Sequence, residues 1–287
     1  MKSIKYWTKI FLLKYLSIKA KAAFNQASKT PEWLDYNELE KLRAEYPVKK
    51  KYEECQNKIE DYYTSPDFQK ADILLSLVED KSKKLHFLEM GCQHGMLSYA
   101  LTLRGHKSTG VDVDTHAFNT EAKEHGVEYY FMDACELKFE DETFDFIVSY
   151  NAFEHMHDPE KALKEAMRVV KKGGYIYLNF NPLYMSPWGL HSWYELAIPY
   201  CQMLFPPDMI RDVVEMKDLW GVNGWSCQAY RDLWKKYENQ LSIVKNNENV
   251  DPFHLNMVVR YPSCFRSKTD CFDDLVVDGI EILFQKK

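Results

Sequence analysis

The sequence lacks the signals of a disulfide-stabilised or zinc-binding protein. It has seven cysteines, an odd number, and no two of them are spaced as Cys-x-x-Cys. The cysteines are scattered along the chain, and no cysteine–histidine pattern has the spacing of a zinc site. We therefore predict reduced thiols, no bound metal and a cytoplasmic location.

The sequence also lacks a membrane-spanning run and an excess of positive charge. No stretch reaches the ~20 apolar residues that a transmembrane helix needs. Lys14 interrupts the short apolar run that follows the basic N-terminus, which argues against a signal peptide. With 37 basic and 43 acidic residues the net charge is −6, whereas nucleic-acid binding needs clustered cations. We predict no transmembrane segment and no nucleic-acid partner.

Internal repeats and low-complexity segments are absent too, so the 287 residues are expected to form ordinary globular structure. Residues 1–65 have helical periodicity and are interpreted as a helical N-terminal extension. Their first helix, through about Phe24, is predicted to be amphipathic. We expect it to pack on the domain, with pairing in a homodimer and contact with a membrane surface as the alternatives. Residues 66–287 are predicted to form one domain.

From about Ser65 onward, short apolar runs alternate with helical patterns. Helices are predicted from about 65 to 78, 96–103, 116–125 and 159–170. Strands are predicted at 85–90, 107–112, 127–132, 144–149 and 175–180. Strands and helices that alternate at this spacing indicate an α/β fold with a doubly wound, mostly parallel sheet.

The alternation stops after residue 180. The aromatic-rich stretch 181–270 is interpreted as a helical insertion after the fifth strand. Near the end, Asp278-Gly279 stands between two runs rich in β-branched residues. Because Asp-Gly favours a two-residue turn, we predict a terminal hairpin of residues 274–277 and 280–284.

Two glycines and an acidic residue carry the first chemical signal. Gly91 and Gly95 follow the first predicted strand and open a helix, where glycine permits close approach of a ligand to the backbone. Asp112 ends the second predicted strand, about 20 residues beyond Gly91. A carboxylate at that place can accept both hydroxyls of a ribose.

Further polar residues follow the third and fourth predicted strands. Asp133 can accept a hydrogen bond from an adenine amine, and Ala134 leaves room for the ring. Asn151 and Glu154-His155 follow the fourth strand. Because open α/β sheets bind ligands at the carboxyl ends of their parallel strands, these side chains are expected to share one site.

Taken together, these segments resemble the motifs of class I S-adenosylmethionine-dependent methyltransferases. Residues 89–95 (EMGCQHG) look like the first motif, residues 110–112 (GVD) the second, residues 133–145 the third and fourth, and residues 169–174 the segment before the fifth strand. The resemblance covers about residues 70 to 180 and the predicted terminal hairpin. It implies a Rossmann-like sheet of seven strands with the last strand antiparallel, and S-adenosyl-L-methionine as cofactor.

The resemblance also implies roles for individual residues. The residues expected at the cofactor are Glu89, Gly91, Gln93, Gly95, Asp112, Val113, Asp133, Ala134 and Asn151. Gly91 and Gly95 would line the methionine part, Asp112 the ribose and Asp133 the adenine. The family usually has a third glycine where this chain has Gln93. A dehydrogenase is disfavoured because the loop lacks the G-x-G-x-x-G pattern.

Methyl transfer to a hydroxyl needs alignment and a base. His155 is the first candidate for the base, His191 the second and Glu154 the third. The insertion and the N-terminal helices are expected to form the acceptor pocket. Residues 185–205 loosely resemble bacterial methyltransferases associated with surface polysaccharides.

We therefore predict O-methylation of a small molecule, a sugar or nucleotide-linked precursor of a cell-surface glycan. The alternatives are an N-methyltransferase of a small metabolite and a non-catalytic binding module that keeps the fold.

Overall fold

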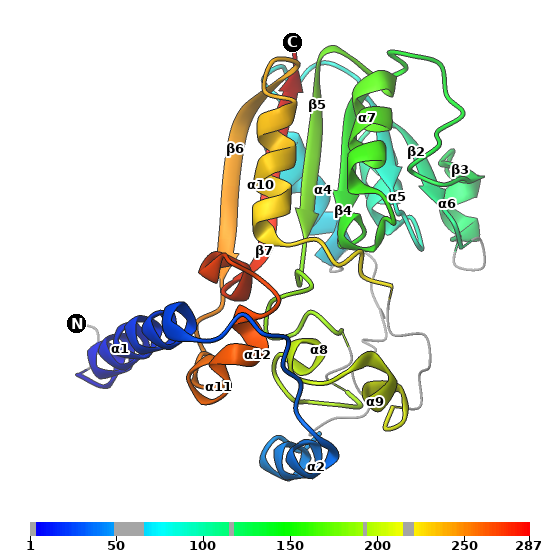
Figure 1. The fold of residues 1–287 in the computed structure, drawn as a ribbon. Coiled ribbons are helices and arrows are strands. Elements are labelled where there is room, and N and C mark those ends of the chain that lie inside the picture. The colour runs from blue at the N-terminus through cyan, green and yellow to red at the C-terminus, as the bar shows by residue number, and fades with distance from the viewer. Residues whose placement is uncertain (1–3, 49–65, 115–117, 192–193, 215–220) are drawn as a thin grey trace. The chain divides into compact units, whose positions relative to one another are not determined.

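A mostly parallel sheet forms the centre of the fold. The computed structural model describes residues 4–48, 66–114, 118–191, 194–214 and 221–287. The strands are β1 (His86–Met90), β2 (Lys107–Asp112), β3 (Glu128–Phe131), β4 (Phe144–Tyr150), β5 (Val170–Phe180), β6 (Leu241–Val250) and β7 (Val277–Lys286). Their order across the sheet is β3-β2-β1-β4-β5-β7-β6 (Figure 1). The five predicted strands are thus confirmed within a few residues.

The directions of the strands match those that the sequence implied. β1 pairs in parallel with β2 and β4, β2 with β3, and β4 with β5. β7 runs antiparallel to β5. The order changes direction beside β1, so the carboxyl ends of β1, β2, β3 and β4 meet at one edge, where sheets of this kind bind ligands.

Helices connect these parallel strands. They are α4 (Pro66–Ser76), α5 (Met96–Leu103), α6 (Thr120–Glu124), the short 3₁₀ helix η2 (Phe153–His155) and α7 (Pro159–Val169). α7 begins with proline at its first turn, and the Asp158 side chain accepts the Lys161 N–H at 2.9 Å. The helix predicted from residue 116 begins at Thr120, because the Asn119 side chain caps it. Residues 115–117 lie outside the described residues.

The terminal hairpin prediction was wrong. Residues 272–275 form a 3₁₀ helix, η3 (Phe272–Leu275), and Asp278-Gly279 lies inside the continuous strand β7. Asp278 is engaged by the chain that follows β5. Its carbonyl oxygen accepts the Leu183 N–H at 2.7 Å, and its carboxylate accepts the Ser186 hydroxyl at 2.7 Å. These bonds hold Asp278 in the strand and leave no turn.

Residues 181–270 are only partly helical. They contain α8 (Cys201–Leu204), α9 (Pro207–Arg211), α10 (Cys227–Lys236), α11 (Asn256–Arg260) and α12 (Pro262–Arg266). They also contain β6, which lies beside β7 at an edge of the sheet. The antiparallel part of the sheet is therefore completed by β6 and not by a hairpin at residue 278.

The chain divides into two compact units. One consists of residues 57–180, 233–247 and 280–287, and the other of residues 1–56, 181–232 and 248–279. The second unit contains α1 (Ile4–Gln26) and α2 (Tyr36–Glu45). Its core includes Phe24, whose ring meets that of Phe272 edge to face, and Tyr200, whose hydroxyl donates to Leu275 O at 2.7 Å.

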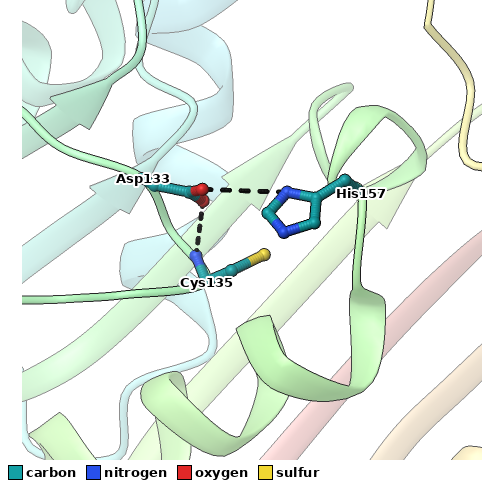
Figure 2. A group of neighbouring side chains, drawn as sticks. All are labelled: Asp133, Cys135 and His157. Carbon is teal, nitrogen blue, oxygen red and sulfur yellow. Dashed lines mark hydrogen bonds and ion pairs between the residues drawn. The ribbon is translucent and has the colours of Figure 1, made fainter.

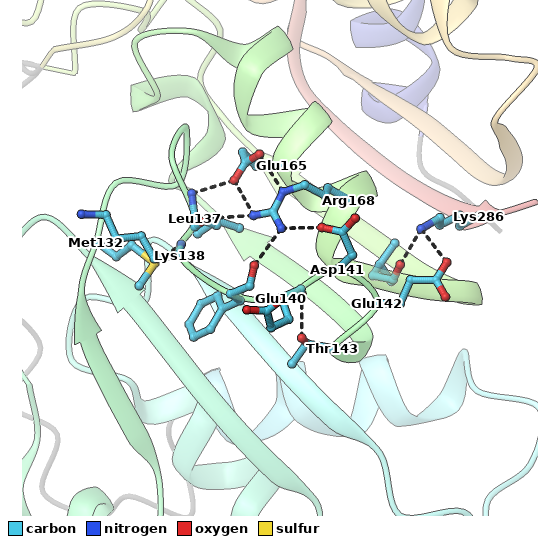
Figure 3. A network of polar contacts seen from close by, with 12 residues as sticks. Met132, Leu137, Lys138, Glu140, Asp141, Glu142, Thr143, Glu165, Arg168 and Lys286 are labelled. Carbon is cyan, nitrogen blue, oxygen red and sulfur yellow. Dashed lines mark hydrogen bonds and ion pairs between the residues drawn. The ribbon is translucent and has the colours of Figure 1, made fainter.

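Within the first unit, Arg168 fixes the segment that leads into β4 (Figure 3). Its guanidinium donates to the carbonyl oxygens of Leu137 and Phe139, each at 2.7 Å, and to the carboxylates of Asp141 and Glu165. Because the Leu137 N–H also donates to Glu165 at 2.8 Å, the segment is held to α7 by several bonds.

None of the helices in the described part of the chain is long and apolar enough to cross a membrane.

Candidate functional site

The loop between β1 and α5 is fastened to the end of β2 by its own backbone. The N–H groups of Gly91 and Cys92 both donate to Val111 O, at 2.9 and 3.1 Å. The Gly95 N–H donates to Cys92 O at 2.6 Å, which closes the loop before α5 begins. The motif glycines therefore lie in a rigid turn at the carboxyl edge of the sheet.

Both motif glycines meet protein atoms closely. Gly91 has φ +74°, and a Cβ there would lie 2.3 Å from the Ala152 side chain. Gly95 has φ +68°, and a Cβ there would lie 2.0 Å from the Tyr129 hydroxyl, which donates to Gly95 O at 3.1 Å. We expected these glycines to admit a ligand, which stays a prediction; in the structure they make room for the loop after β4 and for a tyrosine of β3.

Gln93 and Asp112 are brought together. The Gln93 N–H donates to Asp112 Oδ2 at 2.8 Å, and the Asp114 N–H donates to Asp112 Oδ1 at 2.9 Å. These two bonds orient the carboxylate at the end of β2. Gln93 has φ 45°, so it occupies the left-handed conformation that a third glycine would adopt easily. Val113, beside Asp112, is 64% exposed.

Glu89 lies in β1 and is almost fully buried. Its Oε2 accepts the Ser98 N–H at 3.0 Å and the Ser98 hydroxyl at 2.6 Å, so it caps the first turn of α5. Burial raises the pKa of Glu89 to about 8, more than the two bonds from Ser98 lower it. No sequence pattern indicated Ser98 as the partner of Glu89, because the pair joins a strand to a helix across the loop.

Asp133, Cys135 and His157 form a second cluster of polar atoms, after β3 (Figure 2). Asp133 Oδ1 accepts the Cys135 N–H at 2.8 Å, and Oδ2 lies 3.7 Å from His157 Nδ1. One ligand atom from each residue lies within 4.8 Å of the other two, a donor set that suits a transition metal. Burial raises the pKa of the Cys135 thiol to about 11, so the thiol is protonated at neutral pH. His157 was not among the residues predicted from the sequence.

Ala134 is buried between Asp133 and Cys135. The adenine pocket implied by the resemblance stays a prediction. Its acidic member, Asp133, has a side chain that is 44% exposed and therefore open to a ligand.

The candidates for the base lie in different surroundings. Asn151, which was predicted at the cofactor and not as a base, follows β4 with φ 48°, and its N–H donates to Asn179 O at 2.8 Å. Glu154 is buried, and its Oε1 lies 3.9 Å from Nε2 of the half-exposed His155. His191 belongs to the other unit, where it is buried with φ 60° and its Nε2 lies 3.3 Å from Pro182 O. The role of each residue remains a prediction.

The chemistry at the carboxyl ends of β2 and β3 fits an adenosine. Each oxygen of Asp112 accepts one backbone bond and keeps capacity for another, as a carboxylate offers about four acceptor sites. Two ribose hydroxyls could donate to these oxygens. The exposed part of Asp133 could accept from an amine in the same way. The cofactor would supply an electrophilic methyl group, while these residues would hold its nucleoside.

Comparison with known proteins finds similarity to methyltransferases. Residues 88–178 match the family described as a methyltransferase domain. A ubiquinone biosynthesis O-methyltransferase of Coxiella burnetii is 30% identical over 102 residues, which cover 34% of this chain and 44% of the relative. One of Pseudomonas syringae is 35% identical over 105 residues, 33% of this chain and 45% of the relative. The chain thus spans about half the length of the curated relatives it matches.

Among solved structures, a putative sarcosine dimethylglycine methyltransferase from Galdieria sulphuraria is 17% identical, with a TM-score of 0.49; the similarity covers 76% of this chain and 84% of that chain. The matched segment, 88–178, runs from β1 to β5 and includes every residue predicted at the cofactor. Residues 88–178 of this chain are therefore similar to a methyltransferase domain.

Proposed function

We propose that this chain transfers the methyl group of S-adenosyl-L-methionine to a hydroxyl group of a small molecule. The observation that carries the proposal is the Asp112 carboxylate, which two backbone N–H groups orient at the end of β2 beside the Gly91–Gly95 loop. An oriented carboxylate at this place can bind a ribose with little loss of side-chain freedom.

The acceptor is inferred from two sources of unequal weight. The relatives are named O-methyltransferases of ubiquinone biosynthesis, which supports oxygen as the methylated atom. These names give no support to the sugar or nucleotide-linked acceptor, which rests on a loose sequence resemblance. A hydroxyl acceptor needs a base, and His155 is proposed for it because it follows β4 and its ring is partly exposed.

Titration calorimetry with S-adenosylmethionine and S-adenosylhomocysteine tests the site. We expect saturable binding to the full chain, weakened about a hundredfold in Asp112→Ala because two charge-assisted hydrogen bonds are lost. Asp114→Ala is the matched control. It removes a carboxylate from the same loop but keeps the backbone N–H that orients Asp112. Equal affinity of the two variants would contradict the proposed site.

A turnover assay tests the base separately. His155→Gln should lower the rate of methyl transfer about a hundredfold or more, with cofactor affinity nearly unchanged. An unchanged rate would remove His155 from the mechanism but leave the cofactor site intact.

A further inference from the structure

The first helix is far more basic than the rest of the protein. Residues 1–31 contain seven lysines and no aspartate or glutamate, although the whole chain has a net charge of −6. This charge asymmetry is independent of the methyltransferase motifs, which begin at Glu89. A local positive charge on an acidic protein indicates a negatively charged partner for that segment.

One face of α1 is used for folding. Leu16, Ala20 and Phe24, at helical spacing, join the core of their unit, and Figure 1 shows α1 beside α11 and α12. The Phe24 ring meets the Phe272 ring at 5.7 Å between centroids. This face accounts for the packing that the sequence predicted for the helix.

The opposite face is apolar as well but has no protein cover among the described residues. Phe11, Tyr15 and Ile18 follow one another at intervals of four and three residues, and they are 70%, 56% and 72% exposed. Leu12 is 57% exposed beside them. At 3.6 residues per turn, Phe11, Tyr15 and Ile18 form one stripe along the helix. The helix predicted as amphipathic thus carries apolar side chains on two faces.

Lysines flank this exposed stripe on both sides. Lys14 and Lys19 are exposed and lie at opposite borders of the Phe11–Tyr15–Ile18 stripe. The Lys19 ammonium lies 5.9 Å from the centre of the Tyr15 ring. The exposed apolar stripe with its bordering lysines is suited to the surface of a bilayer, where rings and aliphatic chains can enter the acyl boundary and ammonium groups can meet headgroups.

A second copy of this chain is a poorer partner for the same face. Two α1 helices in contact would place lysines against lysines, with no carboxylate within residues 1–31 to compensate. An anionic lipid surface instead satisfies both the apolar stripe and its positive border.

We propose that the exposed face of α1 binds the surface of membranes that contain anionic lipids. The helix lies in the interface and does not span the bilayer. This binding is independent of cofactor binding, so the two proposals can fail separately.

Co-sedimentation of the full chain with vesicles tests the proposal. One set of vesicles is phosphatidylcholine, and the other is phosphatidylcholine and phosphatidylglycerol in equal parts. We expect binding to the anionic vesicles, weakened by added salt as the charges are screened. The double variant Phe11→Ser/Ile18→Ser should bind at least tenfold more weakly, because the apolar contribution is lost.

A charge-matched pair of variants separates local from overall charge. Lys14→Gln/Lys19→Gln should weaken binding about twenty-fivefold, at roughly fivefold for each lysine near the surface. Lys138→Gln/Lys161→Gln removes two exposed lysines elsewhere and should bind like the wild type. Circular dichroism checks that all variants are folded.

Three outcomes would overturn the proposal. They are no binding to anionic vesicles at low salt, equal loss in both lysine pairs, and self-association that the Phe11→Ser/Ile18→Ser variant abolishes without any vesicle binding. The last result would assign the face to a second copy of the chain.

Discussion

Gln93 adopts a backbone conformation that costs free energy for any residue with a Cβ. Its φ of 45° lies in the left-handed region, where L-residues lose roughly 1–2 kcal/mol relative to the right-handed one. The Gly91–Gly95 turn imposes this conformation through the bond from Gln93 N–H to Asp112. The departure from the family pattern is therefore tolerated at a cost in stability, and the bond to Asp112 is kept.

Substitutions at positions 93 and 95 should change the free energy of unfolding in opposite directions. Gln93→Gly is expected to raise the free energy of unfolding by about 0.5–1 kcal/mol, since relief of strain exceeds the extra chain entropy of glycine. Gly95→Ala should lower it by about 2 kcal/mol or more, because the new Cβ meets the Tyr129 hydroxyl. Urea unfolding of both variants checks this. A loss of stability in Gln93→Gly would mean that its side chain contributes more than its strain.

Glu89 links stability to pH in a predictable direction. Its pKa is about 8 in the folded chain against an ordinary value of 4.5, so between these two pH values the folded state binds a proton that the unfolded state releases. The contribution of Glu89 to the free energy of unfolding is therefore greatest below about pH 4.5 and falls as the pH rises toward 8.

Glu89→Gln should remove that pH dependence. A glutamine oxygen can still accept both bonds from Ser98, and the amide stays uncharged. We expect the stability of the variant relative to wild type to rise between pH 5 and 8, by about 1–3 kcal/mol. Chemical denaturation across that range measures it, with the exposed Glu124→Gln as control. A constant difference at every pH would show that Glu89 is ionised in the folded chain.

At the scale of elements, the Arg168 side chain supplies hydrogen bonds that strand pairing does not give to the segment between β3 and β4. The residues between β3 and β4 form no strand, and their carbonyl oxygens at Leu137 and Phe139 are satisfied by one guanidinium from α7. A planar group with five donors can bind carbonyls and carboxylates together, which a lysine cannot do. The position of β4 relative to α7 thus depends on this side chain.

Arg168→Met should lower the free energy of unfolding by about 1–3 kcal/mol, because Leu137 O and Phe139 O lose their donor in partly buried surroundings. Arg43→Met removes an exposed ion pair with Glu40 on α2 and should change it by less than about 0.5 kcal/mol. Thermal and urea unfolding compare the two. Equal effects would show that the Arg168 bonds are no stronger than a surface pair.

The elements that could be predicted from sequence are those with a local signal. β1 is a mostly apolar run followed by Gly91, and β2 is a short strand that ends at Asp112, so the position of the candidate site follows from their spacing. β6 has the sequence LSIVKNNENV, with consecutive polar residues in place of alternation, because an edge strand exposes much of its surface. The prediction of a turn at Asp278-Gly279 was wrong because the residues that bond to Asp278, Leu183 and Ser186, are distant in sequence.

The arrangement of the candidate site was also predictable only where a local sequence signal exists. The spacing from Gly91 to Asp112 places both at one sheet edge, and the structure joins them through Gln93. The contact of Tyr129 with Gly95, and of Ser98 with Glu89, depends on tertiary packing that no local pattern encodes.

At the scale of the whole molecule, the segment that matches the family is not a complete unit. Residues 66–180 hold β1 to β5, but the unit also includes residues 233–247 and 280–287. On β7, the buried residues Ile282 and Phe284 pair with Leu178 and Ile176 of β5. Without β7, this edge of the sheet would expose both its apolar side chains and its backbone groups.

We therefore expect the fragment 66–180 to be unfolded or aggregated, although it contains every residue predicted at the cofactor. Losing the burial of Ile282, Leu283 and Phe284 costs about 1.5–3 kcal/mol for each side chain, which is comparable with the whole stability of an ordinary domain. Solubility, circular dichroism and cofactor titration of the fragment and the full chain measure this.

A short fusion provides the matched control for that fragment. Phe180 of β5 pairs directly with Ile280 of β7, so an Asn-Gly turn can join residue 180 to residues 280–287 as a two-residue hairpin. The fusion restores the missing strand in its native register and should recover solubility and part of the helical signal. If the fragment without β7 folded as well as the fusion, the five parallel strands and their helices would suffice alone. The pairing of β5 with β7 would then be dispensable for the sheet that carries the site.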